Sequence, residues 1–237
     1  MAKRSQLPKS STGSKDAKST SGSRQGSSRW LLLGVIAAVV IISVGLILFA
    51  IQATQKPIEA TGRVGEGMAW GPTDAKVTIL EFSDFGCSHC RDFALDQGPR
   101  LRAEYEKTGQ VRFEFKPFVL DWNRTADPAN AAACAADQGK FWDYHDALFS
   151  RQGSSAQAFS PAALKAYAGE LGLDTTSFNR CVDKKEQYSL LDQAGAEGRA
   201  RGVNATPTFF INGQKIEGAV AYEVFKGQIS GALSAAQ

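Results

Sequence analysis

The chain has 237 residues, 43% of them hydrophobic, and a formal net charge of +3 at pH 7. Its first 29 residues carry +6, because seven Lys or Arg residues face a single acid there, and the rest of the chain carries −3. A nucleic-acid-binding domain needs a basic folded face, so this distribution argues against a nucleic-acid partner.

The N-terminal part of the chain is typical of a membrane anchor. Residues 1–29 include nine serines and read as a disordered basic tail. An uncharged apolar run of 21 residues follows, from Leu31 to Ile51, and a helix of that length matches a bilayer core of roughly 30 Å. Its length argues against a buried core helix and against a cleaved signal peptide, whose apolar region is about 7–15 residues. We predict a transmembrane signal anchor at 30–52, with a cytoplasmic tail and an extracytoplasmic C-terminal part.

The remaining residues are expected to form a linker at 53–70 and one folded domain at 71–237, a size that can bury a hydrophobic core. Hydrophobic periodicity and turn signals predict the elements of this domain. They are a strand at Lys76–Phe82, a helix from residue 87 to about Lys107, a strand at Gln110–Phe115, several helices between about 126 and 202, a strand within 206–213 that runs into an Asn-Gly turn, its hairpin partner Gln214–Glu217, and a helix at Tyr222–Ala236. This order describes an α/β domain with a helical insertion.

The motif Cys87-Ser88-His89-Cys90 directly follows the first predicted strand. Two cysteines at this spacing can close into a disulfide or open into a dithiol. The first sulfur would lie at a helix N-terminus, where unpaired backbone N–H groups and the helix dipole favour a thiolate. Because the thiolate is the form that attacks disulfides, the motif indicates redox chemistry. A purely structural disulfide is the alternative.

Three segments of the chain resemble those of DsbA-like thiol–disulfide oxidoreductases, members of the thioredoxin-fold superfamily. They are Glu81–Cys90, which is similar to the active-site segment, Ala133–His145, which is similar to the insertion helices, and Val203–Phe209, which is similar to the loop before the cis-proline. The resemblance covers roughly residues 71–237. It implies a thioredoxin fold with a helical domain inserted at about 120–202, and a role in oxidising exported proteins.

Four residues are expected to carry the chemistry. Cys87 would be the exposed nucleophile and Cys90 the shielded thiol that resolves the mixed disulfide. His89 would give a hydrogen bond or positive charge to the Cys87 sulfur, which strengthens the oxidant. Glu81 would have a raised pKa if buried and could relay the resolving thiol's proton; the alternative is a glutamate that reaches solvent. The family frequently has proline at position 88, so Ser88 leaves the strength of the oxidant open.

Further residues are expected to bind substrate or to support the fold. The resemblance implies a cis bond between Thr206 and Pro207, although only about 5–6% of X–Pro bonds are cis. The Thr206 backbone would then pair with an extended substrate segment. His145 is expected to be a core residue. Cys134 and Cys181 are expected to form a structural disulfide, with free buried thiols or a zinc site as alternatives.

These observations predict a membrane-anchored disulfide oxidase without a cofactor or metal, acting as a monomer on reduced exported proteins. A quinone-linked membrane protein, DsbB-like or VKOR-like, would reoxidise it. A reductase or isomerase would use the same residues in the opposite direction. A non-catalytic, membrane-tethered chaperone or binding module is the alternative from a different class.

Overall fold

The structure is a computed structural model that describes residues 66–236, together with Leu33 and residues 40–45. The predicted tail at 1–29 lies outside the described residues, as does most of the predicted anchor at 30–52, of which Leu33 and residues 40–45 are helical. Within the described ranges, no helix is both long and apolar enough to cross a membrane. The chain divides into two units, Met1–Lys56 and Pro57–Gln237, and the second contains the folded domain.

A five-stranded sheet forms the centre of this domain, in the order β1-β3-β2-β4-β5. The strands are β1 (Ala69–Trp70), β2 (Val77–Ser83), β3 (Val111–Pro117), β4 (Thr208–Ile211) and β5 (Gln214–Glu217). β2 and β3 run parallel, whereas the other neighbouring pairs are antiparallel. A parallel pair needs a long crossover connection, and here that crossover carries the Cys87–Cys90 motif.

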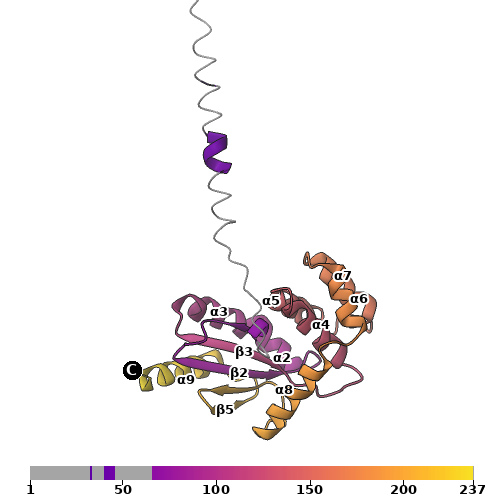
Figure 1. Ribbon diagram of the computed structural model, residues 1–237. Coiled ribbons are helices and arrows are strands. Elements are labelled where there is room, and N and C mark those ends of the chain that lie inside the picture. The colour runs from indigo at the N-terminus through magenta and orange to yellow at the C-terminus, as the bar shows by residue number, and fades with distance from the viewer. Residues whose placement is uncertain (1–32, 34–39, 46–65, 237) are drawn as a thin grey trace, which may run out of the picture. The chain divides into compact units, whose positions relative to one another are not determined.

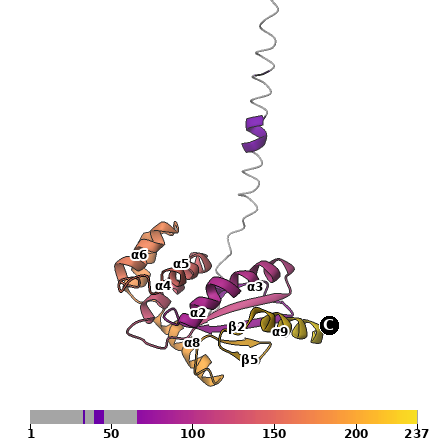
Figure 2. The ribbon, with the colours of Figure 1, turned by 180° about the vertical axis from the view of Figure 1, so that it is seen from behind.

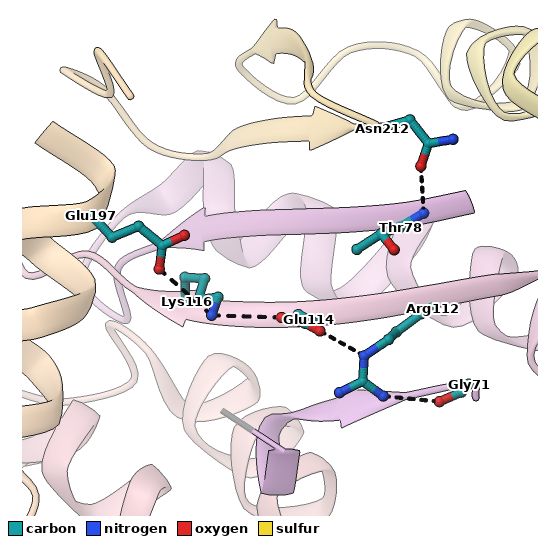
Figure 3. A network of polar contacts seen from close by, with 7 residues as sticks. All are labelled: Gly71, Thr78, Arg112, Glu114, Lys116, Glu197 and Asn212. Atoms are coloured by element: carbon teal, nitrogen blue, oxygen red, sulfur yellow. Dashed lines mark hydrogen bonds and ion pairs between the residues drawn. The ribbon is translucent and has the colours of Figure 1, made fainter. Parts of the chain in front are cut away.

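β3 has the two-residue alternation that its sequence predicts. Its apolar side chains are buried, while Arg112, Glu114 and Lys116 lie on the other face. Figure 3 shows these three side chains in one row of ion pairs, with Arg112 Nε 2.6 Å and Lys116 Nζ 3.5 Å from the Glu114 carboxylate. Lys116 also lies 3.6 Å from Glu197 Oε2 on helix α8 (Tyr188–Ala200). This row therefore ties the sheet to α8.

The segment between β2 and β3 is helical throughout but changes its winding. It runs through α2 (Ser88–Asp92), the π-helical η2 (Phe93–Gln97), α3 (Gly98–Tyr105) and the 3₁₀ turn η3 (Glu106–Thr108). The Gly98 N–H donates to the Phe93 carbonyl five residues back. Pro99 has no N–H and cannot continue the regular hydrogen bonds between residues four apart in an α-helix. This accounts for a π-type bulge at this point. The prediction of one helix from residue 87 to about Lys107 is thus correct in its bounds. It is wrong in expecting a regular α-helix throughout, because the segment contains a π-helical and a 3₁₀ part.

The helical insertion comprises α4 (Ala126–Ala136), α5 (Phe141–Arg151), α6 (Pro161–Glu170), α7 (Thr175–Asp183) and α8. Figures 1 and 2 show α4 to α7 gathered at one end of the sheet, with α3 and α9 (Tyr222–Ala235) toward the other. The alanine-rich α4 is buried along nearly its whole length. Cys134 on α4 is bonded to Cys181 on α7, so the predicted structural disulfide is confirmed. The thioredoxin-like fold with a helical insertion is confirmed as well.

The C-terminal hairpin has the predicted Asn-Gly turn, in which Asn212 and Gly213 both take positive φ, 45° and 87°. The Asn212 side chain accepts a hydrogen bond from Thr78 N at 2.8 Å (Figure 3) and donates to the Lys76 carbonyl at 3.1 Å. This residue therefore fixes the hairpin to the start of β2.

Residues 66–70, which we assigned to the end of the linker, belong to the folded structure. They form a 3₁₀ turn, η1 (Glu66–Met68), and then β1, which pairs with β3. Trp70 is 7% exposed and stacks on Phe113 with 5.4 Å between the ring centroids. The favourable free energy of burying this large ring explains why the chain joins the sheet here.

Candidate active site

Cys87 occupies the N-cap of α2, with extended backbone angles. Its sulfur accepts a hydrogen bond from the Cys90 N–H at 3.4 Å. In the thiol form its S–H donates to the Thr206 carbonyl at 3.3 Å. Cys87 is half-buried, and both Cys87 and Cys90 are free thiols in this structure. The predicted nucleophile is therefore at the helix end, as its position in the motif indicates.

These contacts lower the pKa of Cys87 from 9.0 to about 5. The largest cause is the hydrogen bond from the Cys90 thiol, and partial burial opposes it. The Thr206 side chain and the backbone N–H groups of Cys90 and His89 lower the pKa further. The Thr206 hydroxyl oxygen is buried and has no hydrogen-bond partner among the described residues, so it is available to donate to the thiolate. At neutral pH the Cys87 sulfur is ionised.

Cys90 is the opposite kind of thiol, because it lies fully buried one turn into α2. Burial is the main reason that its pKa is raised, and its hydrogen bond to the Cys87 sulfur raises it further. The Cys90 thiol therefore keeps its proton while Cys87 is ionised. This contrast is the one expected of the predicted nucleophile and resolving thiol, and the roles themselves stay predictions.

Glu81 is only 1% exposed, so the alternative of a strand-end glutamate reaching solvent is wrong. Burial raises its pKa to about 8, the nearby Cys87 sulfur adds to this, and the Ser83 hydroxyl opposes it. The Oε1 atom of Glu81 has no hydrogen-bond partner among the described residues. A carboxyl with a pKa near neutrality can both donate and accept protons there, as the predicted relay requires.

Thr206 and Pro207 belong to a second segment of the chain that reaches the site. Their peptide bond is cis, as the resemblance implied. The Thr206 carbonyl lies at the Cys87 sulfur, although the two residues are 119 positions apart in the chain. The backbone that we expect to pair with substrate is therefore next to the nucleophile. The pairing itself stays a prediction.

His89 acts on the Cys87 sulfur through its backbone. Its side chain is exposed, and among the described contacts its backbone N–H, not its imidazole, acts on the Cys87 thiolate. The proposed influence of the imidazole stays a prediction.

Two residues that the sequence analysis did not single out hold the active-site loop in place. Asp84 is 3% exposed and accepts hydrogen bonds from Gly86 N, Leu120 N and the Thr125 hydroxyl at 2.6–2.8 Å. Its bond to the residue two positions on is an Asx turn, for which Asp-x-Gly is a recognisable sequence signal. A Cβ on Gly86 would lie 2.6 Å from the Thr125 side chain, so this position needs glycine.

Gln152, just after α5, is the second of these residues. Its side-chain amide donates to the Phe85 carbonyl at 2.6 Å and to the Cys87 carbonyl at 3.0 Å. No local pattern marks it, because both contacts cross more than sixty positions of sequence.

Comparison with known proteins agrees with this fold. A family model described as thioredoxin matches residues 63–230. The Na(+)/H(+) antiporter NhaA 1 of Salinispora arenicola is 32% identical over 168 residues, which cover 69% of this chain and 24% of the antiporter. The chain thus spans about a quarter of that relative's length, so antiporter activity is not carried over.

Disulfide bond formation protein D of Bacillus subtilis is 28% identical over 166 residues, covering 67% of this chain and 73% of that protein. The crystal structure of oxidised BdbD from Bacillus subtilis superimposes with a TM-score of 0.66 and 26% identity, covering 71% of this chain and 94% of the other. Both are similar over the part of the chain that holds the paired thiols.

Proposed function

This chain belongs to the thioredoxin family, and we propose that it is a DsbA-like protein disulfide oxidoreductase that introduces disulfide bonds into exported proteins. The observation that favours oxidation of the substrate over its reduction is the contrast between the two thiols. Cys87 is stabilised as a thiolate with a pKa of about 5, whereas burial keeps Cys90 protonated. Interactions that favour the thiolate stabilise the reduced enzyme, so its disulfide is a stronger oxidant.

The reaction begins with an enzyme disulfide between Cys87 and Cys90. A substrate thiolate attacks the Cys87 sulfur, the Cys87–Cys90 bond breaks, and the Cys90 sulfur leaves and takes a proton from Glu81. A second substrate thiolate then attacks the substrate sulfur of the mixed disulfide, and Cys87 leaves as a thiolate. Two electrons pass from the substrate to the enzyme, which holds them as one thiolate and one thiol.

Exposed apolar side chains in the loop after β3 favour an unfolded polypeptide as the substrate. Leu120 and Trp122 are 53% and 41% exposed, and the Leu120 N–H is bound to Asp84 beside the motif. Leu120 is thus bound to the loop that carries the motif, and exposed apolar side chains suit segments that are apolar before they fold. The Thr206 backbone would add main-chain pairing that does not depend on the substrate's side chains.

We place this reaction outside the cytoplasm, with the chain anchored by residues 30–52 and its N-terminus inside. Two observations support this placement: the uncharged apolar run behind a tail of charge +6, and a structural disulfide in the insertion. A quinone-linked membrane protein, DsbB-like or VKOR-like, would take the electrons and restore the Cys87–Cys90 disulfide.

Equilibration of the full chain in detergent with glutathione buffers tests the direction. We expect a potential well above the roughly −270 mV of thioredoxin; a value near −270 mV would instead favour the reductase. In oxidative refolding of a reduced protein, Cys87→Ala should abolish activity, and Cys90→Ala should accumulate a mixed disulfide through Cys87. Full activity of Cys87→Ala would point to the non-catalytic alternative.

Protease digestion of spheroplasts tests the location. With the full chain expressed in a bacterium, protease added outside should remove the domain and leave only the N-terminal fragment. Protection of the domain until the membrane is lysed would contradict the proposed topology.

A further inference from the structure

A cavity of about 310 Å³ reaches Glu81 from between the sheet and the helices α3 and α5. Its walls include the aromatic rings of Trp70, Phe93 and Phe113. Its lining does not include Cys87, Cys90 or Thr206. Glu81 is therefore the group that the cavity and the dithiol site have in common.

The charged residues of the cavity lie where it meets solvent. Arg102 and Glu106 form an ion pair at 3.0 Å, with side chains 39% and 38% exposed. Asp146 also lines the cavity, and its side chain is 56% exposed. These residues, together with His145 and Glu81, are the titratable and charged groups of the lining. The cavity thus leads from a buried carboxyl to a polar surface.

Three buried polar atoms of the lining have no hydrogen-bond partner among the described residues: Glu81 Oε1, Trp142 Nε1 and His145 Nε2. Glu81 and His145 are 1% and 3% exposed. Leaving a buried polar group unpaired costs about 1–3 kcal/mol, so groups of this kind are usually satisfied by ordered water. A cavity of this volume has room for several water molecules.

The hydrogen bonds of His145 fix what its free nitrogen can do. Nδ1 lies 2.8 Å from Asp146 Oδ1, and an ionised carboxylate only accepts, so Nδ1 carries the hydrogen and Nε2 is an acceptor. Burial lowers the pKa of His145; Asp146 opposes this, and the charge of Arg102 adds to it. The ring is held by five aromatic neighbours at centroid distances of 4.8–5.9 Å: Phe85, Phe115, Phe141, Trp142 and Phe149.

Trp142 supplies the complementary group, because its indole Nε1–H can only donate. A water molecule between these side chains can accept from Trp142 and donate to His145, which orients it within the cavity. The lining therefore offers one fixed donor, one fixed acceptor and one titrating carboxyl.

The proposed reaction requires Glu81 to exchange a proton with solvent in each half of the cycle. In the mixed disulfide, a polypeptide is bonded to Cys87 and covers that side of the site. We propose that His145 and Trp142 position a water chain in this cavity that carries protons between Glu81 and solvent. This inference rests on the proposed function, and it makes both side chains positioning residues.

The proton transfers can be followed in the step in which Cys90 resolves the mixed disulfide. The Cys90 thiol gives its proton to the Glu81 carboxylate, and the Cys90 sulfur attacks Cys87 and forms the Cys87–Cys90 bond. The bound polypeptide leaves as a thiolate. The proton on Glu81 then passes through the water chain to solvent near Asp146 and Arg102. In the opposite half of the cycle the same proton enters.

The test measures how fast reduced full chain resolves the mixed disulfide that it forms with a disulfide-bonded peptide, by acid quench and mass spectrometry between pH 5 and 9. We expect His145→Phe, which keeps an aromatic ring, to slow this step about tenfold at pH 7, and Trp142→Phe to slow it to a smaller extent. Tyr144→Phe is the matched control. It removes a hydroxyl from the same helix, but that hydroxyl binds the Leu164 carbonyl and does not line the cavity.

A double-mutant cycle with Glu81→Gln separates positioning from structural effects. Because His145 acts through Glu81, His145→Phe should have no further effect in the Glu81→Gln background, and the thiolate titration of Cys87 should stay unchanged. An equal slowing in both backgrounds, a shifted Cys87 titration or an unchanged rate for His145→Phe would each overturn the proposal. Loss of rate in Glu81→Gln with none in His145→Phe would leave the proposed function intact. Activity in Cys87→Ala would defeat the proposed function itself.

Discussion

The lowered pKa of Cys87 should be visible in how the redox potential changes with pH. At pH 7, a shift from 9.0 to about 5 stabilises the reduced form by about 2.7 kcal/mol. This corresponds to roughly 60 mV for a two-electron couple. Because Cys87 is half-buried, solvent screens part of the interaction. We therefore expect the site to be about 30–60 mV more oxidising than the same dithiol with an ordinary Cys87.

The sign follows from which form binds the proton. The pKa of Cys87 is depressed in the folded reduced protein, so this stabilisation is complete above the ordinary value of 9.0, shrinks as the pH falls below it and is gone below about pH 5. Below the break, two protons accompany two electrons and the potential should change by about 59 mV per pH unit. Above it, one proton does, and the slope should be about 30 mV per unit.

The assay equilibrates the full chain in dithiothreitol or glutathione buffers from pH 4 to 8. Thiols are then alkylated and the two redox forms are counted by mass spectrometry. A background in which Cys134 and Cys181 are both alanine leaves the active pair as the only couple. A single slope near 59 mV per unit up to pH 8 would refute the thiolate assignment.

Three further outcomes are expected. Cys90→Ala should raise the pKa of Cys87 above about 5, because the Cys90 thiol is the largest cause of the shift; thiolate absorbance against pH measures this, and an unchanged titration would exclude that cause. In the reduced protein, folding raises the pKa of Glu81 from 4.5 to about 8, mainly by burial. The oxidised protein keeps the burial and loses the smaller contribution of the Cys87 charge, so its free energy of unfolding should fall by less than about 5 kcal/mol as the pH rises above 4.5, whereas urea titrations of Glu81→Gln should show no such fall. Replacing Cys134 and Cys181 by alanine opens a link across 47 positions and should cost about 3–4 kcal/mol of stability, with peptide oxidation retained; loss of oxidation in a folded variant would give the link a role beyond stability.

Local sequence patterns predicted the elements that local chemistry determines. The alternation in β3, the Asn212-Gly213 turn and the position of Cys87 at a helix start all depend on residues within one element or turn. The structure places each of them as expected. The burial of Glu81 depends on how helices pack over β2, which the pattern of a single strand does not show.

The features that sequence did not predict depend on contacts between distant segments. β1 is only two residues long and so has no periodicity to read; it forms because Trp70 stacks on Phe113. Gln152 contacts the loop of Cys87 although it lies in the helical insertion, just after α5. The free Nε2 of His145 is equally invisible in sequence, where an aromatic helix indicates only core. Pro99 did carry a signal for the π-helical turn, since a proline there interrupts a helix.

The amide of Gln152 has a consequence for how this domain can lose its structure. It bonds the end of α5 to the carbonyls of Phe85 and Cys87, while Phe85 and Cys90 share one apolar cluster with residues of α4 to α7. The insertion and the catalytic loop therefore belong to the same cooperative unit. Local opening of α5 would release the nucleophile's own peptide, so catalytic competence and the integrity of the insertion should be lost together. An excised thioredoxin core would not be a smaller version of this enzyme.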